Sequence, residues 1–175
     1  DLIPHVGCES CHGPGRDHVL AQRRGLPGPE IRTEKRWPNG LDEIKTCGAC
    51  HRMPDSLKAT ELVRNSRVLP RFQPAGLMLS RCYTESKGQM RCTTCHNPHE
   101  KTSTNTAAYE RACMGCHQQL NAATCPKGTT GCVGCHMPRI AFEEVTGFHD
   151  HWIRVRNSPD DPPPQIPAAK TKTPQ

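Results

Sequence analysis

Residues 92–96 read Cys-Thr-Thr-Cys-His, and this Cys-x-x-Cys-His pattern occurs five times in the 175-residue chain. The pattern is typical of covalent c-type haem attachment, in which two sulfurs form thioethers to the porphyrin and the His binds the iron from below. The predicted attachment cysteines are Cys8, Cys11, Cys47, Cys50, Cys92, Cys95, Cys113, Cys116, Cys132 and Cys135. The predicted proximal iron ligands are His12, His51, His96, His117 and His136. The sequence therefore predicts five covalently attached haem c groups.

Paired cysteines have two other common uses. Two Cys-x-x-Cys pairs can supply the four thiolates of a structural zinc site, but zinc does not require a His directly after the second Cys. Thioredoxin-type redox chemistry needs one such pair in a β-α-β context, and not five pairs in a chain with 17 Pro. The pattern therefore favours haem.

Five further histidines lie outside the motifs, one for each predicted haem: His5, His18, His99, His149 and His151. Imidazole is a good iron ligand, so the simplest assignment is five six-coordinate haems with two His ligands each. The alternative is that one or two of these are surface histidines and that a Met completes those irons, the candidates being Met53, Met78, Met90, Met114 and Met137.

Spacing restricts which haem each distal His can reach. His99 follows His96 by three residues, a length that spans at most about 10 Å. This is too short to pass around the macrocycle, so we expect His99 to bind a different haem. His149 and His151 would point the same way on an extended backbone, so we expect them to serve two haems. His5, close before the first motif, could reach another haem or a neighbouring subunit.

The composition is poor in material for a conventional core. Hydrophobic residues make up 34% of the chain, and this figure includes the 12 Cys, while Pro and Gly number 17 and 14. No apolar run approaches the roughly 18 residues of a membrane-spanning helix. We therefore expect a mostly irregular multihaem cytochrome c fold with short α-helices and little β-structure, organised around a stacked haem array and not spanning a membrane. Residues 1–156 would form this pentahaem cytochrome c domain, followed by a Pro-rich tail at 157–175.

Local patterns predict a few elements within the domain. Capping residues and helix-ending glycines predict helices at 16–25, 55–66 (capped by Asp55) and 104–120 (capped by Thr104 or Asn105), with a weak hairpin signal at Lys87-Gly88. Segments 26–46 and 67–91 read as loops. The tail would be a polyproline-like arm that lies on its own domain or docks on a neighbour.

Cys82 and Cys125 remain outside the motifs. Haem attachment takes place outside the cytoplasm, where disulfides persist, so we expect an extracytoplasmic (extracellular or periplasmic) protein in which these two form a disulfide. The bridge would close a loop of about 43 residues and stabilise the fold by about 3–4 kcal/mol. The alternative is two free buried thiols.

The formal net charge of +6 does not indicate a nucleic-acid partner. Five haems bring ten propionates and a charge of about +1 on each oxidised core, which leaves the loaded protein near about +1. The basic residues are thus expected to neutralise propionates. The chain also lacks a basic patch interleaved with aromatic residues.

Several strings resemble multihaem cytochromes c of environmental bacteria, in the broad group related to hydroxylamine oxidoreductase and nitrite reductase cytochromes. They are Gly-Cys-Glu-Ser-Cys-His-Gly-Pro-Gly-Arg-Asp-His-Val (7–19), Ser-Arg-Cys-Tyr-Thr-Glu-Ser (80–86), Cys-Thr-Thr-Cys-His-Asn-Pro-His (92–99), Cys-Val-Gly-Cys-His-Met-Pro-Arg (132–139) and Asp-His-Trp-Ile-Arg (150–154). The resemblance covers about residues 5–156. It implies closely spaced haems in alternating parallel and perpendicular pairs, with His18, His99 and His151 as distal ligands. Longer relatives carry further haem segments upstream, which implies a processed or shortened form here.

These features predict electron transfer between redox partner proteins or extracellular acceptors, and not catalysis. The resemblance extends to small multihaem cytochromes that polymerise into extracellular conductive filaments, where distal His ligands cross between subunits. We therefore expect a homopolymer with a continuous haem chain. The alternatives are a soluble periplasmic carrier and, less favoured, a multihaem oxidoreductase with one open iron. The Cys-x-x-Cys-Lys variant that nitrite reductases use in catalysis is absent from the sequence.

Overall fold

The computed structural model describes residues 6–31, 37–63, 66–118, 125, 128–141 and 146–156. Its α-helices are α1 (Glu9–His12), α2 (Arg16–Arg23), α3 (Gly40–His51), α4 (Gln73–Leu79), α5 (Arg81–Glu85), α6 (Thr106–His117) and α7 (Cys132–His136). The 3₁₀ helices are η2 (Pro54–Ser56), η3 (Ala59–Glu61), η4 (Leu69–Arg71) and η5 (Cys92–Thr94). The strands are β1 (Arg139–Ala141) and β2 (Gly147–His149). The prediction of short helices, irregular chain and little β-structure is confirmed.

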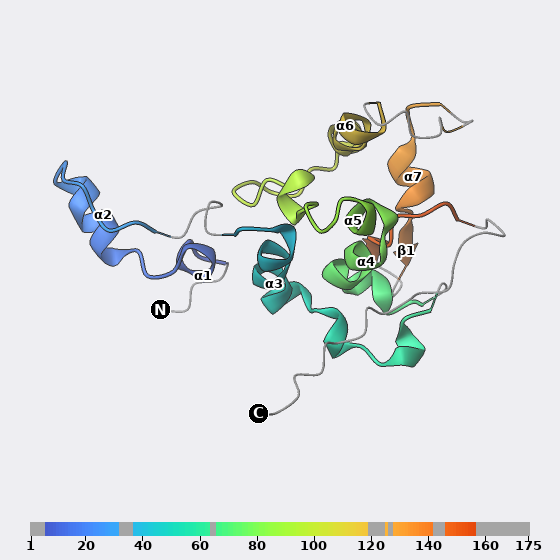
Figure 1. Cartoon of the computed structure of the whole chain (residues 1–175), viewed down its shortest axis with the longest axis horizontal. Coiled ribbons are helices and arrows are strands. Elements are labelled where there is room, and N and C mark those ends of the chain that lie inside the picture. The colour runs from blue at the N-terminus through green and yellow to red at the C-terminus, as the bar shows by residue number, and fades with distance from the viewer. Residues whose placement is uncertain are drawn as a thin grey trace.

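An N-terminal lobe, residues 6–31, lies at one end of the molecule in Figure 1. It carries α1 and α2, while α3 to α7 gather into a body in which α4 packs against α3 and α5, and α6 against α7. β1 and β2 pair antiparallel, with Ile140 opposite Phe148. No helix among the described residues is long and apolar enough to cross a membrane. The tail at 157–175 and His5 lie outside the described residues.

The hydrophobic core is small. It consists of Leu62, Leu69, Phe72, Ala75 and Trp152, all nearly inaccessible to solvent. These side chains come from η4, α4 and two irregular segments, so they join the middle of the chain to the segment after β2. Such a core is thin for a chain of this length.

Two predicted helices are found with nearly the expected bounds. α2 covers Arg16–Arg23, and Gly25 follows it with a φ of 67°. α6 covers Thr106–His117, and the Asn105 side chain accepts a hydrogen bond from the Ala107 N–H at 3.1 Å. This contact is an ordinary N-cap.

The prediction of a loop at 26–46 is wrong in its second half, because α3 begins at Gly40. The Asn39 side chain caps α3 by accepting from the Asp42 N–H at 3.1 Å. Asp42 and Glu43 in the first turn favour the helix N-terminus electrostatically. The cap was missed because the Pro and Gly residues of 26–40 are typical of a loop.

The loop predicted at 67–91 is also wrong, since η4, α4 and α5 all lie in it. Pro74 stands at the start of α4, where a missing N–H costs no helical hydrogen bond. No hairpin forms at Lys87-Gly88. These two residues have φ values of 53° and 74°, and the Gly88 N–H donates to the Tyr83 carbonyl at 3.2 Å, which ends α5.

The helix predicted at 55–66 is replaced by η2 and η3. Leu57 and Lys58 between them are extended, with ψ values of 142° and 152°. The Glu61 carboxylate accepts from the Lys58 N–H at 2.7 Å, so a local side-chain bond competes with helix continuation.

Candidate functional site

The five Cys-x-x-Cys-His motifs lie on helical turns. Four of the motif histidines, His12, His51, His117 and His136, are the last residue of α1, α3, α6 and α7. The remaining motif, at residues 92–96, begins with the 3₁₀ turn η5. On a helix, residues i, i+3 and i+4 share one face. Each motif can therefore turn two sulfurs and an imidazole toward one side, which is the arrangement that covalent haem attachment requires.

His12 and His99 lie together although they are far apart in the sequence. Their ring centroids are 5.9 Å apart and the ring planes differ by 9°. An iron with an imidazole on each side would hold ring centres about 6 Å apart, since a metal–nitrogen bond is about 2.0 Å and the ring radius about 1.1 Å. The spacing of this pair fits two axial ligands of one iron.

His96 and His151 form a second pair of the same kind. Their centroids are 6.1 Å apart and the ring planes differ by 30°. Tyr109 packs beside His96, with ring centroids 5.3 Å apart. Two histidines close in sequence thus belong to different pairs: His96 lies against His151, whereas His99, three residues later, lies against His12.

Many candidate ligands are held by a hydrogen bond from Nδ1. Backbone carbonyls accept from four of them, at 2.7–3.0 Å, the donor and acceptor pairs being His18 with Pro29, His136 with Arg154, His149 with Met137 and His151 with His149. The Oε1 of Gln73 lies 3.3 Å from the Nδ1 of His51. A carbonyl oxygen can only accept, so Nδ1 carries the proton and Nε2 keeps its lone pair for a metal.

The surroundings of His96 and His151 favour the neutral imidazole, the form that binds a metal. Burial, with a smaller contribution from the neighbouring His96, lowers the pKa of His151 to about 4. Burial also lowers the pKa of His96, with a smaller contribution from His51. Both rings are therefore neutral at neutral pH, and the neutral imidazole is the form that coordinates iron.

Ser80 and Gly76 position the segment that carries His151. The Ser80 hydroxyl is fully buried, lies 2.9 Å from the His151 carbonyl, and accepts from the Ile153 N–H at 2.7 Å. A Cβ on Gly76 would lie 2.7 Å from the Trp152 nitrogen and 2.9 Å from the His151 carbonyl carbon. The backbone around His151 is therefore seated directly on α4.

Asp150 gathers two arginines beside this segment. Its buried carboxylate pairs with Arg154 at 3.3 Å and with Arg156. The carbonyl of Arg154 accepts from His136, so the cluster adjoins the motif at 132–136. The Nε of Arg156 is buried without a hydrogen-bond partner. A buried guanidinium N–H in excess fits a group with carboxylates, and a haem carries two propionates.

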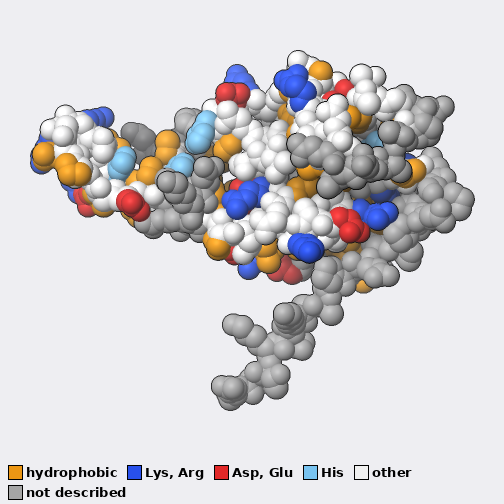
Figure 2. Space-filling model, turned by 45° about the horizontal axis from the view of Figure 1, so that its top comes forward, with side chains coloured by type: hydrophobic (Ala, Val, Ile, Leu, Met, Phe, Trp, Pro, Cys, Tyr) orange, Lys and Arg blue, Asp and Glu red, His pale blue; other side chains and the backbone are white. Residues whose placement is uncertain are grey.

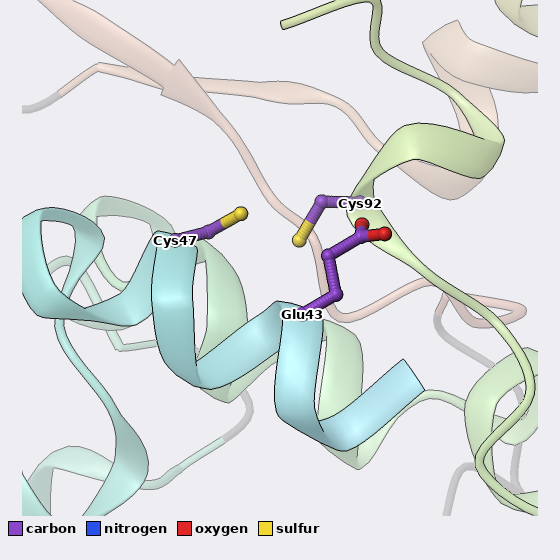
Figure 3. A group of neighbouring side chains, drawn as sticks. All are labelled: Glu43, Cys47 and Cys92. Carbon is purple, nitrogen blue, oxygen red and sulfur yellow. The ribbon is translucent and has the colours of Figure 1, made fainter. Parts of the chain in front are cut away.

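A separate group joins two motifs. Figure 3 shows Glu43 and Cys47 on α3 with Cys92 facing them, and one ligand atom of each lies within 4.8 Å of the others. A hydrogen bond between the two thiols lowers the pKa of Cys47 and raises that of Cys92. These are the first cysteines of two motifs. As a metal site the group is weak, because the Glu43 oxygens already accept bonds from Thr93 at 2.9 Å each.

The disulfide expected between Cys82 and Cys125 is not formed in the structure, where both are free thiols. Burial raises the pKa of Cys82, and the other thiol whose charge acts on it is Cys116 of motif 113–117. Cys125 instead acts on Cys132. The even number of remaining cysteines thus did not identify neighbours in space.

Not all predicted ligands are brought into pairs. Among the described residues, His18, His51, His117, His136 and His149 have no second imidazole in ring contact. The supporting residues Glu43, Gly76, Ser80, Asp150 and Arg156 were missed. Ser80 and Asp150 lie in two of the strings that carry the resemblance, at 80–86 and 150–154, but the strings assigned no role to either residue.

No family model, curated protein or solved structure matches this chain.

Proposed function

We propose that this chain is an electron-transfer protein that binds five haem c groups through its Cys-x-x-Cys-His motifs. The observation that carries the proposal is the pairing of His12 with His99 and of His96 with His151, each at about the separation that one iron requires. Haem iron supplies the chemistry by cycling between its ferric and ferrous forms.

The residues around the motifs would set the spacing of the haems and orient their axial ligands. His96 and His99 belong to two different pairs but are joined by a link that spans at most about 10 Å, so the irons served by them would be neighbours. Nδ1 hydrogen bonds orient the rings and increase their basicity as ligands. At the two irons that these pairs would bind, two His ligands would leave no coordination position for a substrate, which supports electron transfer over catalysis there.

For its assembly we propose a homopolymer outside the cytoplasm, with haems continuous across subunits. The N-terminal lobe lies at the end of the molecule and carries His18, whose Nδ1 is bonded to the Pro29 carbonyl at 3.0 Å. Figure 2 shows histidine side chains at the surface of this lobe and where it meets the body. Such a lobe is placed to offer an imidazole to a neighbouring subunit. The competing assembly is a diffusible periplasmic carrier.

Sedimentation and negative-stain microscopy of native, haem-loaded protein separate the two assemblies. Filaments that break down in the His18→Ala variant support the polymer. A single species near the monomer mass supports a carrier that exchanges electrons with partner proteins or other extracellular acceptors.

A multihaem oxidoreductase is the second candidate. It is favoured by one observation: among the described residues, no imidazole contacts the rings of His51, His117 or His136, so one iron could keep an exchangeable position. A spectral change of the loaded protein on adding nitrite or CO would support this candidate. An unchanged spectrum supports electron transfer alone.

A further inference from the structure

We propose that Glu43 is a positioning residue that fixes the motif at 92–96 against the motif at 47–51 and lowers the reduction potentials of the two haems that these motifs hold. The inference rests on the proposed haem attachment and adds to it a residue that the motif pattern does not contain.

The carboxylate of Glu43 accepts hydrogen bonds from the motif at 92–96. Only 1% of the residue is exposed. Oε1 accepts from the backbone N–H of Thr93, and Oε2 accepts from the Thr93 hydroxyl, both at 2.9 Å. Thr93 lies between the two cysteines of its motif, so the carboxylate holds the motif backbone itself.

Glu43 itself lies on α3, the helix that carries the motif at 47–51. Glu43 and Cys47 are one turn apart on α3, and the Sγ of Cys47 and of Cys92 lie within 4.8 Å of each other and of a Glu43 oxygen (Figure 3). Each sulfur would bind the edge of its own haem. The two haem edges would therefore approach each other next to this carboxylate.

The charge at this point is only partly balanced. Arg91 places Nη1 at 3.7 Å from Oε2 of Glu43, and its side chain is 26% exposed against 2% for that of Glu43. Arg91 is itself held by a bond from Nη2 to the Trp37 carbonyl at 3.2 Å. Donors on both oxygens together with the guanidinium stabilise the ionised carboxylate.

A buried negative charge stabilises the ferric form of a nearby haem relative to the ferrous form. Glu43→Gln keeps the side-chain shape and an oxygen for the Thr93 N–H but removes the charge. At a fixed applied potential we expect the reduced-to-oxidised ratio of two of the five haems to rise by about tenfold, equivalent to about 59 mV for a one-electron couple.

The matched control is Asp55→Asn, which makes the same change in net charge at an exposed carboxylate on η2. Solvent and salt screen such a charge, so the potentials should stay as in the parent protein. The measurement is a spectroelectrochemical titration of parent, Glu43→Gln and Asp55→Asn, after intact mass has counted the haems in each.

Two components that move upward in Glu43→Gln alone support the inference. If Glu43→Gln loads five haems and titrates like the parent, the inference is overturned while the proposed function stands. A parent protein without covalent haem would instead overturn the proposed function.

Arg91→Gln keeps the inference testable if Glu43→Gln fails to load haem. This variant removes the compensating cation and leaves the carboxylate, so the same two components should shift downward. Unchanged potentials in Arg91→Gln, with five haems loaded, would overturn the inference.

Discussion

The imidazole rings of His96 and His151 lie with their centroids 6.1 Å apart, although one ring follows η5 and the other follows β2. Ser80 holds the backbone of His151 through a hydrogen bond to its carbonyl, and His96 is the last residue of the motif at 92–96. Burial lowers the pKa of both rings, and the Nδ1 of His151 is bonded to the His149 carbonyl, which supports the proposal that the pair binds one iron.

Replacing His151 tests this assignment. In His151→Ala we expect one of the five haems to change from low-spin to high-spin and to bind CO, because its iron loses one axial ligand. Electron paramagnetic resonance and the CO difference spectrum measure the change. A protein with five low-spin haems in this variant would contradict the pairing.

His99→Ala should affect a different haem, the one attached through the motif that ends at His12. Combined with His151→Ala, it should give two high-spin haems, since the two pairs share no ring. The measurement is the integrated high-spin signal of the single and double variants. A double variant with the signal of only one haem would contradict the assignment of His99 and His151 to two different irons.

Gly76 is predicted to tolerate no side chain. A Cβ there would meet backbone atoms of Trp152 and His151 at 2.7 and 2.9 Å, so the segment would have to move away from α4. We expect Gly76→Ala to cost about 1–3 kcal/mol in the free energy of unfolding and to weaken the His151 ligand. Gly115→Ala on α6 is the control, because a Cβ there meets nothing within 4 Å. Equal stability of the two variants in denaturant would count against the close packing.

Ser80 is predicted to stabilise the same segment through hydrogen bonds. Ser80→Ala removes the hydroxyl that accepts from the Ile153 N–H at 2.7 Å and leaves that N–H only its bond to the His151 carbonyl at 3.0 Å, a loss of about 0.5–1.5 kcal/mol. Ser56→Ala, at an exposed position on η2, should change the free energy of unfolding by less than about 0.5 kcal/mol. Chemical denaturation of both variants measures the difference, and a neutral Ser80→Ala would refute the role assigned to this hydroxyl.

The sequence predicted short helices, irregular chain and little β-structure because the Pro and Gly content is a local signal. α2 and α6 followed from their bounding residues in the same way. α3 and α4 were missed because Asn39 and Pro74 start helices inside segments that otherwise read as loops.

The supporting residues could not be predicted, since their role depends on contacts between distant segments. Glu43 bonds to Thr93, and Ser80 to the segment around His151, across 50 and 71 positions of the chain. Glu43 lies in none of the motifs or strings that the sequence singles out, and the string at 80–86 gives no partner for the Ser80 hydroxyl. The bridge expected between Cys82 and Cys125 was wrong in the structure for the same reason, because parity does not report distance.

The intact mass of the denatured protein tests the central claim most directly, because denaturation removes everything that is not covalently bound. We predict a mass about 3 kDa above the 19.4 kDa polypeptide, corresponding to five haems in thioether linkage. A mass equal to that of the polypeptide, with zinc found in the native protein by metal analysis, would contradict it.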